Sequence, residues 1–375
     1  MTKILRLTTA DISLNSLLKG QLHFLSKEFD VVGVASDTGV LQKVSEREDV
    51  RVVNLTMHRE ISPVADIKSL FALINLIRRE RPDIVHANTP KASLLGMIAA
   101  FICCVPHRIY TVTGLRFETS TGIMRFILKT MERITCICAT KVIPEGDGVK
   151  NALLREKITC KPMQKIHNGN INGVDLEWYD RTDEVMQQAK EIKGKTTEFR
   201  FVFVGRIVRD KGICELIDAF TRLCNERNDV KLILVGRFED KLDPLPKGTK
   251  EIIDNNSNID FVGYQSDVRP YLASSDVLVL PSYREGFPNV VLQAGAMGLP
   301  VIVSDVNGSD EVIEPGVNGL IIPKYDPDAL YQAMIAMVEN TKVTSEMSYS
   351  AREIITKKFD QRDVWSEISK MYKNL

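Results

Sequence analysis

Long apolar runs are missing from this sequence. No stretch of the 375 residues reaches the roughly 18 uninterrupted apolar residues of a membrane-spanning helix. Lys3 and Arg6 lie within a predicted strand, KILRLT, and not ahead of an apolar segment, so we see no secretory signal. We therefore expect the protein to be made and kept in the cytoplasm.

Cysteine pairs are also missing. The sequence has seven cysteines, but they form no C-x-x-C pair and have no histidine at the spacing of a zinc site. Cysteine is often simply a small buried side chain. We expect all seven to be reduced core or near-core residues.

Two signals of nucleotide or nucleic-acid recognition are absent. The first predicted strand runs into TADISLNS and not into a G-x-G-x-x-G turn, which argues against a nicotinamide dehydrogenase. Zinc-finger spacing, an aromatic RNA-binding strand and a basic arm are missing too. Nucleic acid is therefore not an expected partner.

Net charge is zero, but the two halves of the chain differ. Residues 1–175 contain 24 Lys and Arg against 17 Asp and Glu, whereas residues 176–375 contain 25 against 32. The balances are +7 and −7. A basic amino-terminal half favours an anionic partner, and an anionic membrane surface fits better than nucleic acid.

One segment of the basic half, TGIMRFILKTMERITCICA at residues 121–139, has the pattern of an amphipathic helix. Such a helix can lie at a membrane interface with its basic face toward anionic lipid. The alternative is a core-packed helix with a solvated basic face. The apolar side would carry Ile123, Phe126, Ile127, Thr130 and Ile134, and the basic side Arg125, Lys129 and Arg133.

Apolar runs alternate with helical patterns along almost the whole chain. Continuous Val- and Ile-rich runs are typical of parallel strands that helices cover on both faces. Two sets of such strands predict an α/β fold with two doubly wound domains. The predicted strands are KILRLT, VVGVAS, DIVHAN, RIYTVT, KVIP and KIHNG, then FRFVFVG, VKLILVG, IDFVGY, DVLVLPS, PVIVSD and GLIIP.

The boundary between these domains is expected after HNGNINGVDLEWYD, where glycines and asparagines interrupt the periodicity. This gives one domain at residues 1–175 and a second at 176–357. The final segment, about 358–375, has helical spacing and can pack back on the first domain or stay with the second.

The most informative motif is REGFPNVVLQAGAMGLP, residues 284–300, which follows the strand DVLVLPS. Gly286 permits a tight turn, and Pro288 fits the first position of a helix. The backbone N–H groups of residues 289–291 would then point out of the helix start beside Glu285, where they can hold an anion such as phosphate. An ordinary connection between strand and helix is the alternative.

A second motif lies in FRFVFVGRIVRDKGICELIDAF, residues 199–220, where a strand ends at Gly205-Arg206 and a helix begins near Gly212. Arg206 and Lys211 flank that helix start, where cations are unfavourable unless an anion is bound. Arg offers a planar fork of donors to phosphate, and Lys offers a mobile charge. Together the two loops predict a diphosphate site, and a solvated loop with incidental charge is the alternative.

These residues resemble a known family. The pairing of VGRIVRDKG with PSYREGFPNVVLQAGAMGLPVIVSD is similar to the retaining GT-B glycosyltransferases of family 4, and HANTPKASLLGMIAA followed by YTVTGL resembles their amino-terminal domains. The likeness covers essentially the whole chain. More narrowly, it resembles bacterial transferases that extend lipid-linked glycans for capsule, O-antigen or protein glycosylation.

The resemblance implies two Rossmann-like domains that face a cleft and hold a UDP-sugar mainly through the second domain. A hexose or N-acetylhexosamine would pass to a saccharide acceptor, expected to be linked to polyprenyl diphosphate. The reaction would retain the anomeric configuration. The departing phosphate oxygen would take the acceptor's proton, so that no enzymatic nucleophile is needed.

The resemblance also implies roles for individual residues. Arg206 and Lys211 match the cationic pair on the diphosphate, and Glu285 matches the first acid of the family's E-x7-E motif, which contacts sugar hydroxyls. Asn289 and Val290 match amides near the distal phosphate, and residues 262–264 match the place of base recognition. The implied donor-binding residues are Gly205, Val262, Tyr264, Gly286, Phe287, Asn289, Val290 and Gln293.

Two positions depart from the family pattern. Gln293 stands where the second Glu of E-x7-E usually grips the ribose; its amide can still bond a diol and removes a negative charge. Thr113 in YTVTGL stands where many relatives carry a histidine that touches the donor sugar, and a threonine can supply only a hydroxyl hydrogen bond.

Three residues are candidates for the acceptor side: Thr113, His86 and Lys91. His86 ends the strand DIVHAN, where the alternative is a hydrogen-bonded structural histidine. Lys91 begins the next predicted helix, where a cation makes sense beside an acceptor phosphate.

No metal or other cofactor is expected. Asp326-Pro-Asp328 superficially resembles a metal-binding D-x-D motif, but it precedes the helical pattern DALYQAMIAMV, which favours helix capping.

Two other functions remain open. One is an epimerase or hydrolase of nucleotide sugars with the same architecture. However, Glu285 has no obvious second acid of the kind that flanks the bond in glycoside hydrolases. The other is a weakly active nucleotide-binding partner subunit. The glutamine at Gln293, in place of the usual second Glu, favours this alternative.

Overall fold

The computed structural model of the chain describes residues 1–239 and 243–375, which divide into two compact units. Unit 1 consists of Met1–Gly173 and Gln361–Leu375, and unit 2 of Val174–Asp360. The observed change of unit at Val174 lies two residues before the expected start of the second domain at residue 176.

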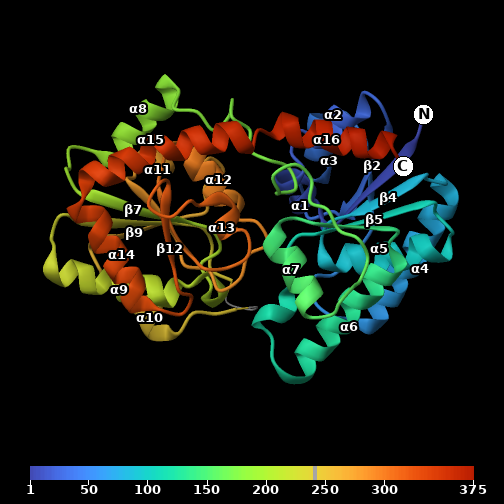
Figure 1. Cartoon of the computed structure of the whole chain (residues 1–375), viewed down its shortest axis with the longest axis horizontal. Coiled ribbons are helices and arrows are strands. Elements are labelled where there is room, and N and C mark those ends of the chain that lie inside the picture. Colours follow the sequence, from blue (N-terminus) through green and yellow to red (C-terminus); the bar gives the residue numbers. More distant parts are fainter. Residues whose placement is uncertain (240–242) are drawn as a thin grey trace. The chain divides into compact units, whose positions relative to one another are not determined.

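Unit 1 contains a six-stranded parallel sheet with the strand order β3-β2-β1-β4-β5-β6 (Figure 1). The apolar runs of the sequence form its central strands, which are buried on both faces. Its strands are β1 (Lys3–Ala10), β2 (Asp30–Ser36), β3 (Arg51–Asn54), β4 (Ile84–Ala87), β5 (His107–Val112) and β6 (Lys141–Pro144).

One predicted strand of unit 1 was wrong, and one strand was missed. KIHNG, residues 165–169, forms a turn, because His167 and Gly169 have positive φ angles of 48° and 101°, which a regular strand does not contain. The sixth strand is instead β3, a short edge strand with both ends exposed, which the sequence did not suggest.

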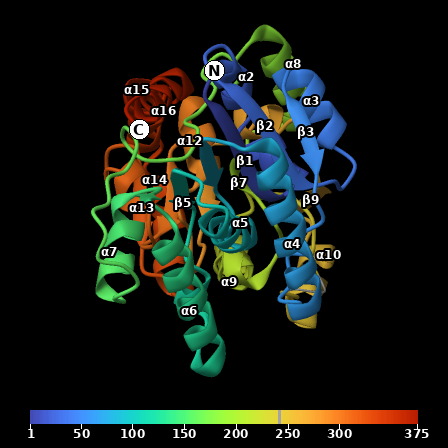
Figure 2. The ribbon, with the colours of Figure 1, turned by 90° about the vertical axis from the view of Figure 1, so that its right-hand side faces the viewer.

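Helices cover both faces of this sheet. One hydrophobic cluster packs α4, α5, α6 and α7 against one face, and another packs α1, α2, α3 and α16 against the other (Figure 2). The final helix, α16, therefore belongs to unit 1. The helices are α1 (Asp11–Leu17), α2 (Gln21–Ser26), α3 (Leu41–Glu48), α4 (Pro63–Glu80), α5 (Pro90–Ile102), η1 (Arg116–Thr119), α6 (Gly122–Cys138), α7 (Asp147–Arg155) and α16 (Gln361–Lys373).

Unit 2 repeats the arrangement with the strand order β12-β11-β10-β7-β8-β9, again all parallel. The six predicted strands of this half are all present. They are β7 (Phe199–Val204), β8 (Val230–Val235), β9 (Ile259–Gly263), β10 (Val277–Leu280), β11 (Val301–Ser304) and β12 (Gly319–Ile322).

The helices of unit 2 also lie on both sides of its sheet, with α9, α10 and α14 on one side and α8, α11, α12 and α15 on the other (Figure 1). They are α8 (Asp183–Lys193), η2 (Arg209–Lys211), α9 (Ile213–Glu226), α10 (Lys247–Asn255), α11 (Arg269–Ala273), α12 (Asn289–Ala296), α13 (Ser309–Val312), α14 (Pro327–Glu339) and α15 (Thr341–Lys358). Two doubly wound α/β units are thus confirmed.

The cysteines differ in part from expectation. All seven are free thiols, and Cys136 and Cys138 are buried in the core of unit 1. Cys104 and Cys160, however, are exposed, because each lies in a loop that follows a helix of the sheet's covering layer.

Candidate functional site

The two motif loops of unit 2 lie at the same edge of its sheet. β7 and β10 are neighbouring parallel strands, so the segments that follow them emerge side by side at their carboxyl ends. This edge is where open α/β sheets bind ligands. The structure therefore brings Gly205 and Arg206 onto the same edge as Glu285 and Gly286.

Lys211 and Glu285 form a hydrogen-bonded ion pair that joins the two loops. Their side chains are 19% and 14% exposed, so the pair is shielded from solvent without being enclosed. Both groups keep enough accessible surface to meet a ligand. The geometry holds one positive and one negative group together at the edge of the sheet.

Backbone contacts fix the two loops against each other around this pair. The amide of Tyr283 donates to the carbonyl of Asp210 at 2.9 Å, and the Arg284 guanidinium lies 3.1 Å from the Asp210 carboxylate. Gly212, with φ +69°, approaches so closely that a Cβ there would lie 2.0 Å from the Pro281 carbonyl oxygen. Glycine is required at Gly212 for both reasons.

Arg206 is placed differently from Lys211. Its guanidinium is exposed and pairs with Glu239 at 2.7 Å. Within residues 1–239 and 243–375, no hydrogen bond or ion pair joins Arg206 to Lys211 or Glu285. The two expected cations thus lie on one loop, but they pair with different acids: Lys211 with Glu285 and Arg206 with Glu239.

The start of α12 differs by one residue from the prediction. Pro288 is the cap, with φ −78° and ψ 96°, and Asn289 is the first helical residue. The amide of Val291 is not free, because it donates to the Pro288 carbonyl at 3.0 Å. The amide of Val290 makes no hydrogen bond within the described part of the chain.

The residues around this helix start have distinct environments. Phe287 is buried in the core, 5.6 Å from the Phe359 ring, so only its backbone is left to meet a ligand. Gly286 lies against Gly308. A Cβ added at Gly308 would lie 2.7 Å from the Gly286 carbonyl oxygen. Gln293, one turn into α12, is half-buried, and its side-chain amide makes no hydrogen bond with the residues that the structure describes.

The strand ends expected near the base carry an aromatic side chain and a cation. Tyr264 is exposed, and the guanidinium of Arg237 lies 4.2 Å from the centroid of its ring. The Val262 carbonyl accepts a hydrogen bond from Gln265 at 2.8 Å. Gly205 is held by its amide, which donates to the Val235 carbonyl at 2.9 Å.

Arg237 is a further candidate site residue that the sequence analysis missed. β8 ends at Val235 and is followed by Gly236-Arg237, just as β7 ends at Val204 and is followed by Gly205-Arg206. The two strands are neighbours, and the Ile207 amide donates to the Arg237 carbonyl at 2.8 Å. The repeated V-G-R ending was the signal that pointed to a second arginine at this edge.

His86 lies inside unit 1 rather than at its surface. Its Nδ1 faces the Arg6 guanidinium and the Tyr372 hydroxyl, and its Nε2 lies 2.7 Å from the Thr111 hydroxyl. Burial, and then the Arg6 charge, hold the pKa of His86 well below its usual value. Both ring nitrogens are engaged, so the geometry fits the structural alternative and not an acceptor contact.

Lys91 is also engaged within unit 1. Its ammonium group is buried, pairs with Asp66 in the first turn of α4 and donates to the Glu60 carbonyl, both at 2.5 Å. The expected free cation is therefore already neutralised, because a buried charge needs a partner. An acceptor phosphate would have to replace Asp66.

Thr113 follows β5, and its hydroxyl donates to the Asn88 carbonyl at 2.8 Å. Asn88 was missed by the sequence analysis. Its side chain is buried after β4, and neither its Oδ1 nor its Nδ2 has a hydrogen-bond partner among residues 1–239 and 243–375. A buried amide without partners is rare, which makes Asn88 a polar group available beside Thr113.

Helix α6 places the two predicted faces of residues 121–139 differently from the expectation. Arg125 and Lys129 each pair with Glu156 at 2.9 Å, and Arg133 donates to the Glu156 carbonyl, so the basic face packs on the segment after α7. The apolar face is the exposed one, with Ile123 81% and Phe126 67% exposed. The helix is neither core-packed on its apolar face nor basic toward solvent.

Asp326 is a helix cap, as predicted. Its carboxylate accepts a hydrogen bond from the Ala329 amide at 2.8 Å at the start of α14. In the described ranges 1–239 and 243–375, no group of three or more His, Cys, Asp or Glu is arranged to hold a metal ion. The same ranges include no helix that is both long enough and apolar enough to cross a bilayer.

Comparisons with known proteins agree with these features. Residues 198–340 match the family described as Glycosyl transferases group 1, and residues 3–143 match Glycosyl transferase 4-like. The chain is 33% identical to the capsular polysaccharide biosynthesis glycosyltransferase CapM of Staphylococcus aureus, over 99% of this chain and 96% of CapM.

A second relative is the Escherichia coli UDP-Gal:alpha-D-GlcNAc-diphosphoundecaprenol alpha-1,3-galactosyltransferase. It is 30% identical, over 89% of this chain and 86% of that one. Anabaena HepE in complex with UDP-glucose shares the fold, with a TM-score of 0.82 at 21% identity and full coverage of both chains. This chain therefore belongs to the group 1, GT4-like glycosyltransferases, with two Rossmann-like units of the GT-B architecture.

Proposed function

We propose that this glycosyltransferase moves a hexose or N-acetylhexosamine from a UDP-sugar to a saccharide acceptor carried on a polyprenyl diphosphate. The observation that carries the proposal is the Lys211–Glu285 ion pair at the sheet edge of unit 2. It places a cation for the diphosphate next to an acid for the sugar hydroxyls. The name of the E. coli relative, which gives a UDP-sugar donor and a diphosphoundecaprenol acceptor, supports the same pair of substrates.

In this reaction the site must stabilise the leaving group, UDP. The bond between the anomeric carbon and a diphosphate oxygen breaks, and the acceptor oxygen bonds to that carbon on the same face. The acceptor's proton passes to the departing phosphate oxygen, so UDP leaves and configuration is retained. Lys211, Arg206 and the Val290 amide would stabilise the growing negative charge.

Glu285 has a different role in this proposal. Its carboxylate accepts hydrogen bonds from hydroxyls of the transferred sugar, while Lys211 holds it in place. Gln293 would bond the ribose through its unengaged amide, and Tyr264 with Arg237 would offer a flat surface to the uracil ring. Metal independence is part of the proposal, since the D-P-D sequence caps a helix.

Contact with the membrane is proposed through the exposed apolar side of α6. Ile123 and Phe126 offer the apolar surface of an interfacial helix. Arg125 and Lys129 of the same helix are already paired with Glu156, so the apolar side chains would supply most of the binding to the membrane.

The test is a transfer assay with purified protein, a panel of UDP-sugars and a synthetic lipid diphosphate saccharide, with and without EDTA. The expected result is one elongated product from one UDP-sugar, with the anomeric configuration of the donor and with unchanged turnover in EDTA. UDP release without any acceptor would favour the hydrolase or epimerase. An inverted product, or activity that needs added Mg²⁺ or Mn²⁺, would contradict the mechanism.

A further inference from the structure

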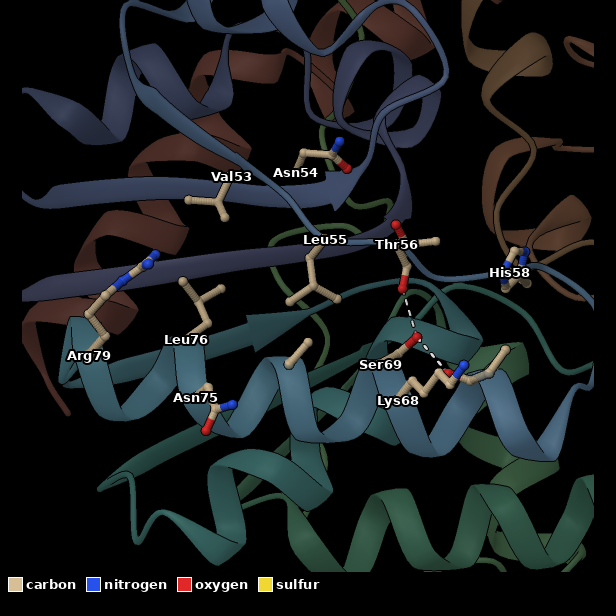
Figure 3. A pocket seen from close by; sticks show the side chains of 12 residues that line it. Val53, Asn54, Leu55, Thr56, His58, Lys68, Ser69, Asn75, Leu76 and Arg79 are labelled. Carbon is tan, nitrogen blue, oxygen red and sulfur yellow. Dashed lines mark hydrogen bonds between the residues drawn. The ribbon is translucent and has the colours of Figure 1, made fainter.

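A groove of about 610 Å³ runs along the edge of unit 1, and none of the predicted acceptor-side residues lines it. Edge strand β3 and the segment that follows it form one wall, and helix α4 forms the other (Figure 3). Its volume lies in the range of small-molecule sites. Neither the sequence motifs nor the proposed donor site explains it.

The floor of the groove is apolar. Ala65 and Ala72 lie on the side of α4 that faces β3, and their small side chains leave room above the buried Leu55 and Leu76. The hydroxyl oxygen of the buried Ser69 lies 2.7 and 2.9 Å from the carbonyl oxygens of Thr56 and Ala65, which share its one hydrogen as acceptors. The floor therefore suits an apolar ligand, because its buried hydroxyl is already hydrogen-bonded within the protein.

The rim of the groove is basic. His58, Lys68 and Arg79 line it, and no lining residue is acidic. Figure 3 shows Arg79 at one end of the row and His58 at the other, with Lys68 toward the His58 end. Lys68 makes no hydrogen bond or ion pair with any residue that the structure describes, and Arg79 meets only the edge of Glu80, at 3.4 Å.

The neighbouring side of α4 is apolar and exposed. Val64, Ile67 and Phe71 are 70%, 55% and 61% exposed and recur at helical spacing beside the groove. An apolar patch next to a cationic rim suits a ligand that has both an apolar chain and an anionic group. A free sugar phosphate would use the cations but leave the floor and this patch unexplained.

One end of the groove is tied to the carboxyl edge of the unit 1 sheet. Lys91, at the start of α5, binds both Asp66 in the first turn of α4 and the Glu60 carbonyl in the preceding loop. From Ala65 to Arg79 the helix rises about 21 Å, enough to accompany an extended apolar chain. The groove thus leads away from the edge where an acceptor saccharide is expected.

We propose that this groove binds the isoprenoid phosphate part of the lipid-linked acceptor. The apolar chain would lie on the floor between β3 and α4, and its phosphate would be held by Lys68 and His58 at the end of the groove that is tied to the carboxyl edge of the sheet. The inference rests on the proposed function, because it assigns a place to the carrier lipid of that acceptor.

The test uses farnesyl phosphate as the probe, titrated into the full-length protein by calorimetry without any donor. We expect it to bind at least about ten times more tightly than either farnesol or inorganic phosphate. The double change Lys68→Glu with Arg79→Glu should weaken binding about tenfold or more, since two attractive charges become repulsive. Arg78→Glu, on the same helix but outside the groove, should leave it unchanged.

A second pair of variants tests the floor. Ala72→Trp should fill the groove and abolish binding of farnesyl phosphate, whereas Phe71→Trp on the exposed side should not. Stabilisation by UDP should persist in every variant, which shows that each one folds. If Ala72→Trp and the double variant both bind farnesyl phosphate with the affinity of the wild-type protein, the inference is overturned.

Two further outcomes separate this inference from others. If Ala72→Trp loses flotation with phosphatidylglycerol vesicles but keeps farnesyl phosphate binding, the groove holds bilayer lipid and the proposed occupant is wrong. If the wild-type protein fails to respond to UDP, the proposed function fails, whatever farnesyl phosphate does. If UDP binds and the groove variants change nothing, only the present inference fails.

Discussion

At the scale of single residues, the Lys211–Glu285 pair is the centre of the proposed chemistry. In the proposed function, this cation would meet the diphosphate and the neighbouring acid would meet the sugar. Its position depends on backbone contacts between two loops, not on either side chain alone. Changes at the pair and changes at its support should therefore have different signatures.

Removing the cation should affect turnover. Lys211→Ala is expected to lower kcat by roughly 10² to 10³, the usual cost of deleting one stabiliser of transition-state charge. Steady-state transfer kinetics measure it, with Lys357→Ala, an exposed lysine of the same unit, as the control. Turnover near that of the wild type in Lys211→Ala would remove this residue from the mechanism.

Disturbing the support should affect stability first. Gly212→Ala forces a Cβ against the Pro281 carbonyl at a backbone angle that favours glycine, and should cost about 1–3 kcal/mol. Gly248→Ala is the matched control, because no atom lies within 4 Å of the position where its Cβ would be. Urea unfolding compares the two. Equal midpoints would show that the close approach to Pro281 is not structural.

At the scale of elements, α16 is attached to unit 1 by polar as well as apolar contacts. The Tyr372 hydroxyl lies between the buried Arg6 guanidinium, at 3.0 Å, and His86 Nδ1. Trp365 adds a bond from its indole nitrogen to Asn172 at 2.7 Å. Arg6 has no carboxylate partner among these contacts and depends on neutral acceptors such as Gln21, at 2.8 Å.

Removing one of these acceptors should loosen the helix. Tyr372→Phe leaves a buried cation and a buried imidazole each short of a partner, at an expected cost of about 1–3 kcal/mol. Tyr349→Phe, whose ring is 85% exposed, should change nothing. Thermal and urea unfolding measure the difference. If both variants unfold with the wild type, the hydroxyl does not hold α16 in place.

Helix α6 gives a pH-dependent prediction. Burial raises the pKa of Glu132 to about 7 from 4.5, and the Tyr110 hydroxyl, which donates to it at 2.7 Å, offsets this only in part. A raised pKa means that the folded state binds the proton more tightly than the unfolded state. This contribution to stability is complete below pH 4.5 and is lost as the pH rises through about 7.

Glu132→Gln keeps a hydrogen-bonding side chain but cannot ionise. The wild-type free energy of unfolding should therefore fall relative to that of the variant by about 3 kcal/mol between these two pH values. Urea unfolding of both proteins across that range measures it. Parallel pH curves for the two proteins would contradict a buried, protonated Glu132.

At the scale of the whole molecule, strand periodicity predicted two parallel sheets correctly, because buried Val and Ile runs follow directly from burial on both faces. β3 escaped notice since an edge strand of four residues with exposed ends has no such run. KIHNG was mistaken for a strand because its apolar residue and lysine look like the other strand starts, although His167 turns the chain.

The candidate site was predictable where its residues lie close together in the sequence. The loops after β7 and β10 carry their cations, acid and glycines in short motifs, and these could be found from sequence. The partners of His86 and Lys91 could not, because Tyr372 lies 286 residues from His86 and Asp66 lies 25 residues from Lys91. Whether a polar side chain is free or engaged depends on such distant partners.

One measurement tests the central claim, that unit 2 holds a UDP-sugar at the Lys211–Glu285 pair. It is a thermal-shift panel of UDP, GDP, ADP and their sugar conjugates without metal, since a ligand of the folded state raises apparent stability by mass action. The account predicts stabilisation by UDP species, strongest for one UDP-sugar and lost in Lys211→Ala. Stabilisation by GDP species would replace the donor, and no response to any nucleotide would contradict the claim.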